Sequence, residues 1–389
     1  MTEQAPKLVI LGAAPVRIWG LDNAERLRRA FARAGVTEVL HDPEQLPRDS
    51  DLILVRADSV IEQNLIADLV ARRGVLLGEG PEAGGTRRLF AAHVQNGAAE
   101  AAAELLRSGS VTQAEPLPEE LILLAPTELG SAYNKSLRKR ANPYALRLSR
   151  ESLTAIEKKT FAASYKGATD FVTKYVWPWP ARHMTRWAAQ LGISPNSVTT
   201  VSLLLVILTF WLFWRGDFLL GCLAGWGMCL LDTVDGKLAR VTLTASPWGN
   251  VYDHGIDLIH PPFWYWAWWV GLLAIMPETE YIALEMALWV IVVGYIIGRI
   301  MEGIFHRGFG LQTHIWRKVD SRFREITARR NPNLFLLTLA TLAGRPDLGF
   351  YAVAVWTVLS LMFHAVRLLQ AAWIRLRGGE VRSWLLDEA

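Results

Sequence analysis

The chain has 389 residues, 51% of them hydrophobic, and a formal net charge of only +4 at pH 7. This length allows two domains, and so small a net charge excludes any assignment of a partner from charge alone. Two cysteines in one apolar run exclude a disulfide framework. Charges are spread through the first 190 residues, whereas apolar runs dominate the rest, which predicts a soluble domain followed by a membrane domain.

The first 125 residues alternate short apolar runs with helical patterns. We expect strands and helices in turn at residues 8–11, 23–34, 36–40, 52–55, 63–72 and 97–106. This alternation predicts an α/β layer with a mostly parallel sheet. The N-terminus lacks a basic start followed by a long apolar stretch, so we expect no signal peptide.

The order of these elements resembles the nucleotidyltransferase fold of sugar-phosphate and inositol-phosphate cytidylyltransferases. Arg17, which ends the loop after the first strand, and Asp58, after a later strand, stand where those enzymes place a loop arginine and a metal ligand. The loop here reads GAAPVR, in which Pro15 removes a backbone donor that a phosphate needs. This departure from the family's loop favours a degenerate, non-catalytic domain over residues 1–125, which would act as a scaffold or contact a partner. An active cytidylyltransferase is the alternative.

Residues 126–193 are predicted to be a basic juxtamembrane linker. Its cations are Lys135, Arg138, Lys139, Arg140, Arg147, Arg150, Lys158, Lys159 and Lys166. Interleaved aromatic residues make this pattern typical of a membrane surface, with nucleic acid as the weaker alternative partner. Residues 169–191 predict an amphipathic interfacial helix, interrupted by Pro178 and Pro180.

Six apolar segments follow and predict a six-helix membrane domain over residues 194–376, with a tail at 377–389. They are residues 198–214, 218–231, 251–276, 281–300, 334–343 and 348–373. Several are shorter than the roughly 20 residues that a span needs, and the fifth is the weakest. Cys222 and Cys229 share one face of the second segment, as small core residues would.

The distribution of Lys and Arg predicts the orientation of these segments. The connection over residues 299–333 and the tail are basic, whereas the other short connections hold few cations. Basic connections stay in the cytosol. We therefore expect a multi-pass protein of the inner cell membrane whose termini and polar site face the cytosol.

Four aspartates stand at the ends of two of these apolar stretches. Asp232 and Asp235 are three residues apart, and Asp253 and Asp257 are four apart, so each pair shares a helix face. A carboxylate costs about 2.5–3.5 kcal/mol at the centre of a membrane helix. Hard divalent cations bound by oxygen would neutralise the four; solvated helix ends are the alternative.

Glycines and an arginine are spaced with these carboxylates. Gly236 and Gly249 leave room for a phosphate ester, and Arg240 offers a planar cation. The whole pattern, D-x-x-D-G-x-x-A-R-x(8)-G-x-x-x-D-x-x-x-D, resembles the signature of the CDP-alcohol phosphotransferase family at every position. The resemblance covers about residues 134–376.

The resemblance implies transfer of a substituted phosphate from a CDP-alcohol, such as CDP-diacylglycerol, to an alcohol, with release of CMP. It implies two Mg²⁺ or Mn²⁺ ions held by Asp232, Asp235, Asp253 and Asp257, with Asp257 as general base. It also implies a homodimer. The implied contacts to the CDP group come from Asn196, Thr199, Gly236, Ala239, Arg240, Ser246 and Gly249. For Asn196, capping of the helix by itself or by Ser194 is the alternative.

In relatives that accept inositol phosphate, basic residues hold the acceptor's phosphate. Arg299, at the end of the fourth segment, and Arg329 and Arg330, in the basic connection, are the matching candidates. Snorkelling arginines at the membrane interface are the alternative for each. A cation transporter would also use the carboxylates, but it would leave Gly236 and Arg240 without a role.

Overall fold

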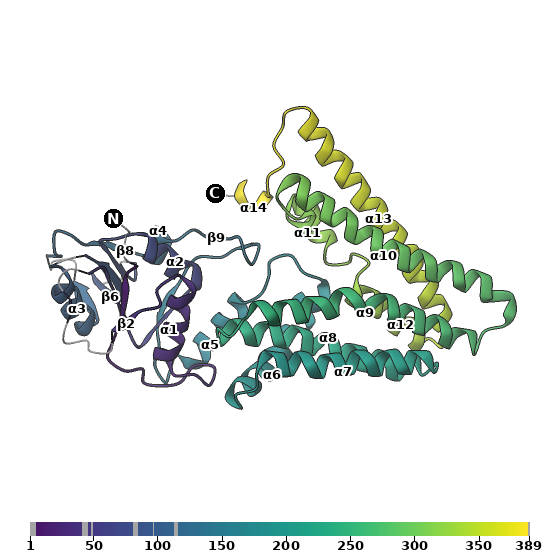
Figure 1. Cartoon of the computed structure of the whole chain (residues 1–389), viewed down its shortest axis with the longest axis horizontal. Coiled ribbons are helices and arrows are strands. Elements are labelled where there is room, and N and C mark those ends of the chain that lie inside the picture. The colour runs from purple at the N-terminus through teal and green to yellow at the C-terminus, as the bar shows by residue number, and fades with distance from the viewer. Residues whose placement is uncertain are drawn as a thin grey trace. The chain divides into compact units, whose positions relative to one another are not determined.

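The computed structural model describes residues 5–40, 46–47, 50–80, 85–95, 97–112 and 116–387. The chain divides into two compact units (Figure 1). The first comprises Met1–Tyr165, Ala189–Gly192 and Arg240–Leu243. The second comprises Lys166–Ala188, Ile193–Ala239 and Thr244–Ala389. Parts of the N-terminus and of the predicted tail, residues 1–4 and 388–389, lie outside the described residues.

A seven-stranded sheet with the order β2-β1-β3-β6-β5-β8 forms the centre of the first unit, and β7 pairs with β6. Its strands are β1 Lys7–Leu11, β2 Val39–Leu40, β3 Leu52–Arg56, β5 Val75–Gly78, β6 Thr86–Val94, β7 Ser110–Thr112 and β8 Ile122–Leu124. β1 is parallel to β2 and β3, and β5 is parallel to β8. β6 is antiparallel to its three neighbours, so the predicted, mostly parallel sheet has one reversed strand.

Helices cover both faces of this sheet because neighbouring residues of a strand point to opposite sides. On one face, Leu8 and Ile53 pack with residues of α1 (Asn23–Arg33) and α2 (Gln63–Ala71). On the other, Val9 and Leu54 pack with α3 (Ala99–Ser108). The three predicted helices of this region are thus found.

Smaller elements complete the first unit. They are β4 Ser59–Ile61, α4 Pro126–Leu129, β9 Tyr133–Asn134, β10 Lys139–Arg140, β11 Ala145–Arg147 and α5 Leu153–Ala163. β11 pairs antiparallel with β4, so part of the predicted linker belongs to this unit. The boundary predicted at residue 125 stays a prediction, whereas the compact unit continues to Tyr165.

The second unit is helical. Its main helices are α6 Pro178–Gln190, α7 Pro195–Trp214, α8 Phe218–Val241, α9 Pro247–Leu273, α10 Tyr281–Phe309, α12 Arg330–Leu342 and α13 Pro346–Leu376. Short elements are η1 Val172–Val176, η2 Glu278–Glu280, η3 Thr313–Ile315, α11 Lys318–Phe323 and α14 Trp384–Asp387. Each of the six predicted apolar segments overlaps one helix. In chain order these helices are α7, α8, α9, α10, α12 and α13.

Four helical stretches of the described chain are long and apolar enough to cross a membrane. They are Pro195–Trp214, Phe218–Val241, Glu278–Phe309 and Pro346–Leu376. α9 carries Asp253, Asp257 and two internal prolines, and α12 has only 13 residues. At 1.5 Å per residue, α12 is about 20 Å long, shorter than the hydrocarbon core of about 30 Å. The six-span count therefore stays a prediction.

Small residues let the helices of this unit approach closely. A Cβ atom at Gly271 of α9 would stand 2.2 Å from the carbonyl oxygen of Phe213 in α7. One at Gly294 of α10 would stand 2.5 Å from the side chain of Thr357 in α13. Cys222 and Cys229 are free and fully buried in the same core, as predicted.

The predicted interfacial stretch forms two helical pieces, the π-helix η1 and the α-helix α6, which meet at Trp177. Large aromatic side chains are exposed along them, namely Phe171, Tyr175, Trp179 and Trp187. Exposed aromatic residues with nearby cations suit the interfacial region of a bilayer. The placement of this stretch at a membrane interface stays a prediction.

Candidate metal centre and active site

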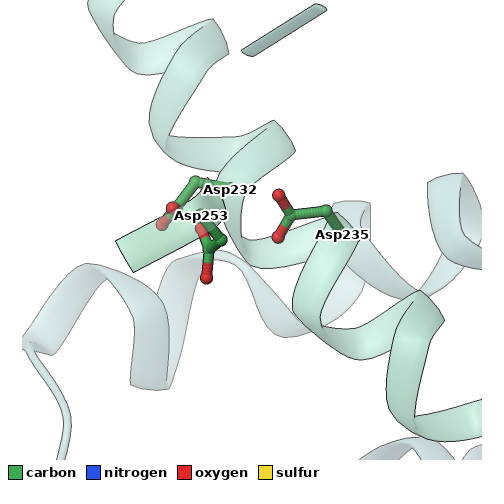
Figure 2. Close-up of side chains that lie close together, drawn as sticks. All are labelled: Asp232, Asp235 and Asp253. Atoms are coloured by element: carbon green, nitrogen blue, oxygen red, sulfur yellow. The ribbon is translucent and has the colours of Figure 1, made fainter. Parts of the chain in front are cut away.

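Three of the four predicted aspartates converge. Asp232 and Asp235 project from one face of α8, and Asp253 projects from α9 toward them (Figure 2). One carboxylate oxygen from each lies within 4.8 Å of the others. Such an all-oxygen group is the donor set that hard divalent cations prefer.

Asp235 is the most deeply buried member of this group, with 3% of its surface exposed. The hydroxyl of Thr199, on α7, donates a hydrogen bond to its Oδ2 atom at 2.6 Å. Its Oδ1 atom is buried and has no hydrogen-bond partner among the described residues. An unpaired, buried carboxylate oxygen facing two more carboxylates fits a cation ligand, because an uncompensated buried charge is costly.

Arg330 links two of the four aspartates. It is the first residue of α12, and its guanidinium donates charge-assisted hydrogen bonds to Asp232 and Asp257. Asp257 is not part of the converging group, and 40% of its side chain is exposed. The roles of Asp257 as metal ligand and general base remain predictions.

Residues predicted to bind the CDP group lie at the first turns of α7 and α9. A Cβ atom at Gly249 would stand 2.8 Å from Oδ1 of Asn196 and 3.1 Å from Oγ of Ser246. Ser246 caps α9 by accepting a hydrogen bond from the Gly249 amide at 3.0 Å. Ser194, rather than Asn196, caps α7.

Of the remaining predicted CDP contacts, Thr199 binds Asp235, and Gly236 and Ala239 follow Asp235 along α8. Arg240 lies in the last turn of the same helix but belongs to the first unit. The contacts of these residues with a nucleotide stay predictions.

The three arginines predicted to bind the acceptor line one pocket of about 490 Å³, including the solvent at its mouth. Arg299 comes from α10, Arg329 immediately precedes α12, and Arg330 begins it. Tyr265 and Tyr295 also line this pocket. The structure therefore brings together three cations that stand up to 31 positions apart in the sequence.

Sequence analysis missed Glu302, which lines the same pocket. Its carboxylate accepts hydrogen bonds from Arg299, at 3.3 Å, and from Arg329. Glu302 thus holds both guanidiniums in place. Its spacing of three residues from Arg299, within one apolar helix, was the signal that could have found it.

In the first unit, Asp58 is engaged by two arginines. Arg56 donates to both of its carboxylate oxygens at 2.9 Å, and Nε of Arg147 donates to Oδ2 at 3.0 Å. Burial alone would raise the pKa of Asp58, but these guanidiniums lower it. Arg17 is exposed on the loop after β1. This arrangement is an ion-pair network and not an open metal site.

Clustered carboxylates in a bundle of apolar helices thus lie beside an arginine-lined pocket. Residues 192–364 match the family described as CDP-alcohol phosphatidyltransferase, and this part of the chain is a domain of that family.

Individual relatives match over shorter stretches. Cholinephosphotransferase 1 of Xenopus laevis is 30% identical over 125 residues, which cover 29% of this chain and 29% of that protein. Archaetidylinositol phosphate synthase of Pyrococcus horikoshii is 34% identical over 79 residues, covering 20% of this chain and 42% of the relative. The chain thus spans less than half the length of each of these two relatives.

Among solved structures, the phosphatidylinositol phosphate synthase of Mycobacterium tuberculosis with bound CDP-DAG is similar to part of this chain. The match covers 48% of this chain and 92% of the synthase chain. The sequence identity is 17% and the TM-score is 0.39.

Proposed function

We propose that this protein is an integral membrane enzyme that transfers a substituted phosphate group from a CDP-alcohol to an alcohol, releasing CMP. CDP-diacylglycerol is the proposed donor, and phospholipid or related polar-lipid synthesis the process. The observation that carries the proposal is the convergence of Asp232, Asp235 and Asp253 beside a pocket lined by three arginines.

The carboxylates would hold divalent ions, Mg²⁺ or Mn²⁺. When bound, such ions neutralise a pyrophosphate and stabilise the charge that develops on its oxygens. Asp232, Asp235 and Asp253 supply the donors that meet in the structure, and Thr199 orients Asp235. The proposed two-ion site also includes Asp257, the partner of Arg330.

In the proposed reaction, the acceptor hydroxyl attacks the phosphorus that carries the donor's alcohol. The bond from that phosphorus to the bridging oxygen breaks, and CMP leaves with the bridging oxygen. Asp257 takes the hydroxyl proton, as general bases do within hydrogen-bond reach. Arg330 would orient its carboxylate, because the two already share a hydrogen bond.

The charge of the acceptor pocket favours an anionic alcohol. Arg299, Arg329 and Arg330 contribute three positive charges, and Glu302 contributes one negative charge, so the four together carry +2. Guanidiniums match phosphate oxygens in geometry and charge. We therefore propose a phosphorylated polyol as the acceptor, with inositol phosphate as the first candidate.

The first unit is proposed to be a non-catalytic scaffold resembling a cytidylyltransferase. Its Asp58 is occupied by Arg56 and Arg147, and Pro15 interrupts the phosphate loop. Trp19, which follows Arg17 and Ile18 at the end of this loop, is buried and donates from its indole to Thr160 at 2.9 Å. Consumption of CTP by the purified protein would instead support a bifunctional enzyme.

The basic connection before α12 supports a cytosolic active site, with both termini in the cytosol and the helices in the inner membrane. A homodimer is proposed on the family resemblance alone.

Release of CMP tests the proposed activity. Purified protein in lipid nanodiscs would receive CDP-diacylglycerol, Mg²⁺ or Mn²⁺, and either inositol phosphate or glycerol phosphate. We expect CMP with a phosphorylated acceptor and at least a hundredfold slower release for Asp257→Asn. No CMP from any pair, or an Asp257→Asn variant as fast as the parent, would falsify the proposal. Metal flux into liposomes would favour the transporter alternative.

A further inference from the structure

Asp170 is a buried carboxylate to which the proposed chemistry gives no role. It precedes η1 in the juxtamembrane stretch, and 8% of its surface is exposed. Its Oδ1 atom accepts hydrogen bonds from the Thr173 amide at 3.0 Å and from the Asn331 amide group at 2.9 Å. Its Oδ2 atom accepts from the Thr173 hydroxyl at 2.8 Å. Both oxygens are therefore committed to neighbours within the second unit.

The bond to Asn331 reaches the start of α12. Asn331 is 4% exposed, and its Nδ2 atom also lies 3.2 Å from the hydroxyl of Thr173. The two residues before it are Arg329, which binds Glu302, and Arg330, which binds Asp232 and Asp257. Asn331 is thus fixed next to both arginines, at the point where the connection becomes helix.

A second set of contacts holds the same connection from its other end. The amide of Phe171 donates to the carbonyl of Glu325 at 2.9 Å. Nζ of Lys174 lies 2.5 Å from the carboxylate of Glu325. The stretch from Asp170 to Lys174 therefore contacts the connection between α11 and α12 at both Glu325 and Asn331.

Hydrogen bonding keeps Asp170 charged despite its burial. Burial alone would raise its pKa, but the hydrogen bonds from Thr173 and Asn331, with the nearby charge of Arg324, lower it below its usual value. A hydrogen bond to an ionised group is stronger than one between neutral groups. The Asp170 carboxylate therefore holds the Asn331 side chain through a charge-assisted hydrogen bond.

We propose, as an extension of the proposed function, that Asp170 is a positioning residue for acceptor recognition. It fixes Asn331, and Asn331 fixes the start of α12, so that Arg329 and Arg330 are held at the acceptor pocket. Asp170 touches neither substrate nor metal in this scheme. Its loss should weaken the binding of a phosphorylated acceptor and leave donor binding intact. Because Arg330 also contacts Asp257, the chemical step should slow as well.

Steady-state kinetics in nanodiscs tests this role. For Asp170→Ala we expect the KM for inositol phosphate to rise about tenfold, the effect of losing a charged hydrogen bond, with the KM for CDP-diacylglycerol within twofold of the parent. Asp170→Asn, which retains the oxygen that Asn331 uses but not its charge, should recover part of the loss. Asp217→Ala, the same change at an exposed turn, should match the parent.

The Asn331→Ala variant tests the same positioning role independently, and it replaces Asp170→Ala if that variant does not fold. It should raise the acceptor KM to the same extent, and the double variant should be no worse than either single one, because the two residues form one link. An acceptor KM within twofold of the parent in a folded single variant would overturn the proposal. Additive effects in the double variant would also overturn it.

A binding measurement separates this inference from the proposed function. Inorganic phosphate should raise the unfolding temperature of the parent and of Asp217→Ala, but not that of Asp170→Ala or Asn331→Ala. If the parent releases no CMP yet this pattern is found, the proposed reaction fails and the positioning role stands. If phosphate protects all variants equally, or protects none including the parent, the positioning role is wrong.

Discussion

At the scale of single residues, the motif aspartates could be predicted from sequence because their spacing alone puts them on shared helix faces. Glu302 carries a similar local signal, its spacing of three residues from Arg299 in one apolar helix, whereas Asp170 carries none. The role of Asp170 depends on contact with Asn331, 161 positions away. No local pattern records such a contact, and a buried carboxylate reads in the sequence like any other acidic residue.

The hydroxyl of Thr199 is expected to set the metal affinity of the site. Thr199→Val removes the hydrogen bond to Asp235, so the carboxylate loses its orientation, and residues that orient a ligand contribute about 10–100-fold to metal affinity. Electron paramagnetic resonance with Mn²⁺ should show binding at least tenfold weaker. The control is Thr200→Val, since the Thr200 hydroxyl contacts the Asn196 carbonyl and Tyr252 and no motif aspartate. Equal affinity in both variants would exclude this role.

Gly249 is expected to be needed for donor binding. In Gly249→Ala the new methyl group would meet Asn196 at 2.8 Å and Ser246 at 3.1 Å, so both side chains must move. We expect the KM for CDP-diacylglycerol to rise about tenfold, with the acceptor KM unchanged. Gly255→Ala, in the same helix but with open space around its Cβ, is the control. A donor KM that is equally unchanged in both would show that Asn196 and Ser246 do not bind the donor.

At the scale of helices, hydropathy predicted where the apolar helices occur but not where they end. The second apolar segment stops at Leu231 in the sequence, whereas α8 continues to Val241. In the added turns, Asp232 and Asp235 face another carboxylate, and Asp235 accepts a hydrogen bond from Thr199. Hydropathy measures the mean character of a stretch and cannot detect that its polar residues share one inward face.

The contact of α7 with α9 is expected to tolerate no side chain at Gly271. The Cβ of Gly271→Ala would stand 2.2 Å from the Phe213 carbonyl and 3.0 Å from the Gly216 amide, both backbone atoms that cannot rotate away. We expect a loss of about 1–3 kcal/mol in the free energy of unfolding, seen as a lower melting temperature in detergent. Gly303→Ala, with open space around its Cβ, is the control, and equal melting temperatures would contradict the packing described.

At the scale of the whole chain, the sequence separated an α/β part from an apolar helical part because their charge content differs. It did not indicate that the first unit extends to Tyr165 or includes residues 240–243. Those residues join it through tertiary contacts, such as the bond at 3.2 Å from Arg29 to the Thr242 carbonyl and the packing of Leu243 with its core. Composition cannot reveal contacts between segments 200 residues apart.

The first unit is expected to lose stability in mild acid because of His93. Burial lowers the pKa of His93, which stays neutral with its Nδ1 atom 3.0 Å from the Leu69 carbonyl. Unfolded histidine titrates near pH 6.5, so below that pH only the unfolded state takes up the proton, and the free energy of unfolding falls. Hydrogen exchange of β5 and β6, corrected for intrinsic rates, should show this fall between pH 7 and 5.5. His93→Asn should remove most of it; an unchanged pH dependence would contradict this origin.

In the proposed function, Arg330 is common to the metal centre and the acceptor pocket, because it contacts Asp232 and lines that pocket. A cation that enters the carboxylate group competes with its guanidinium for Asp232, and an anionic acceptor that engages the guanidinium frees that same oxygen. Each ligand thereby breaks the Arg330–Asp232 ion pair, with which the other ligand would otherwise have to compete. Thermodynamic reciprocity then requires that metal tighten acceptor binding by the same factor as acceptor tightens metal binding. The two ligands should therefore bind cooperatively.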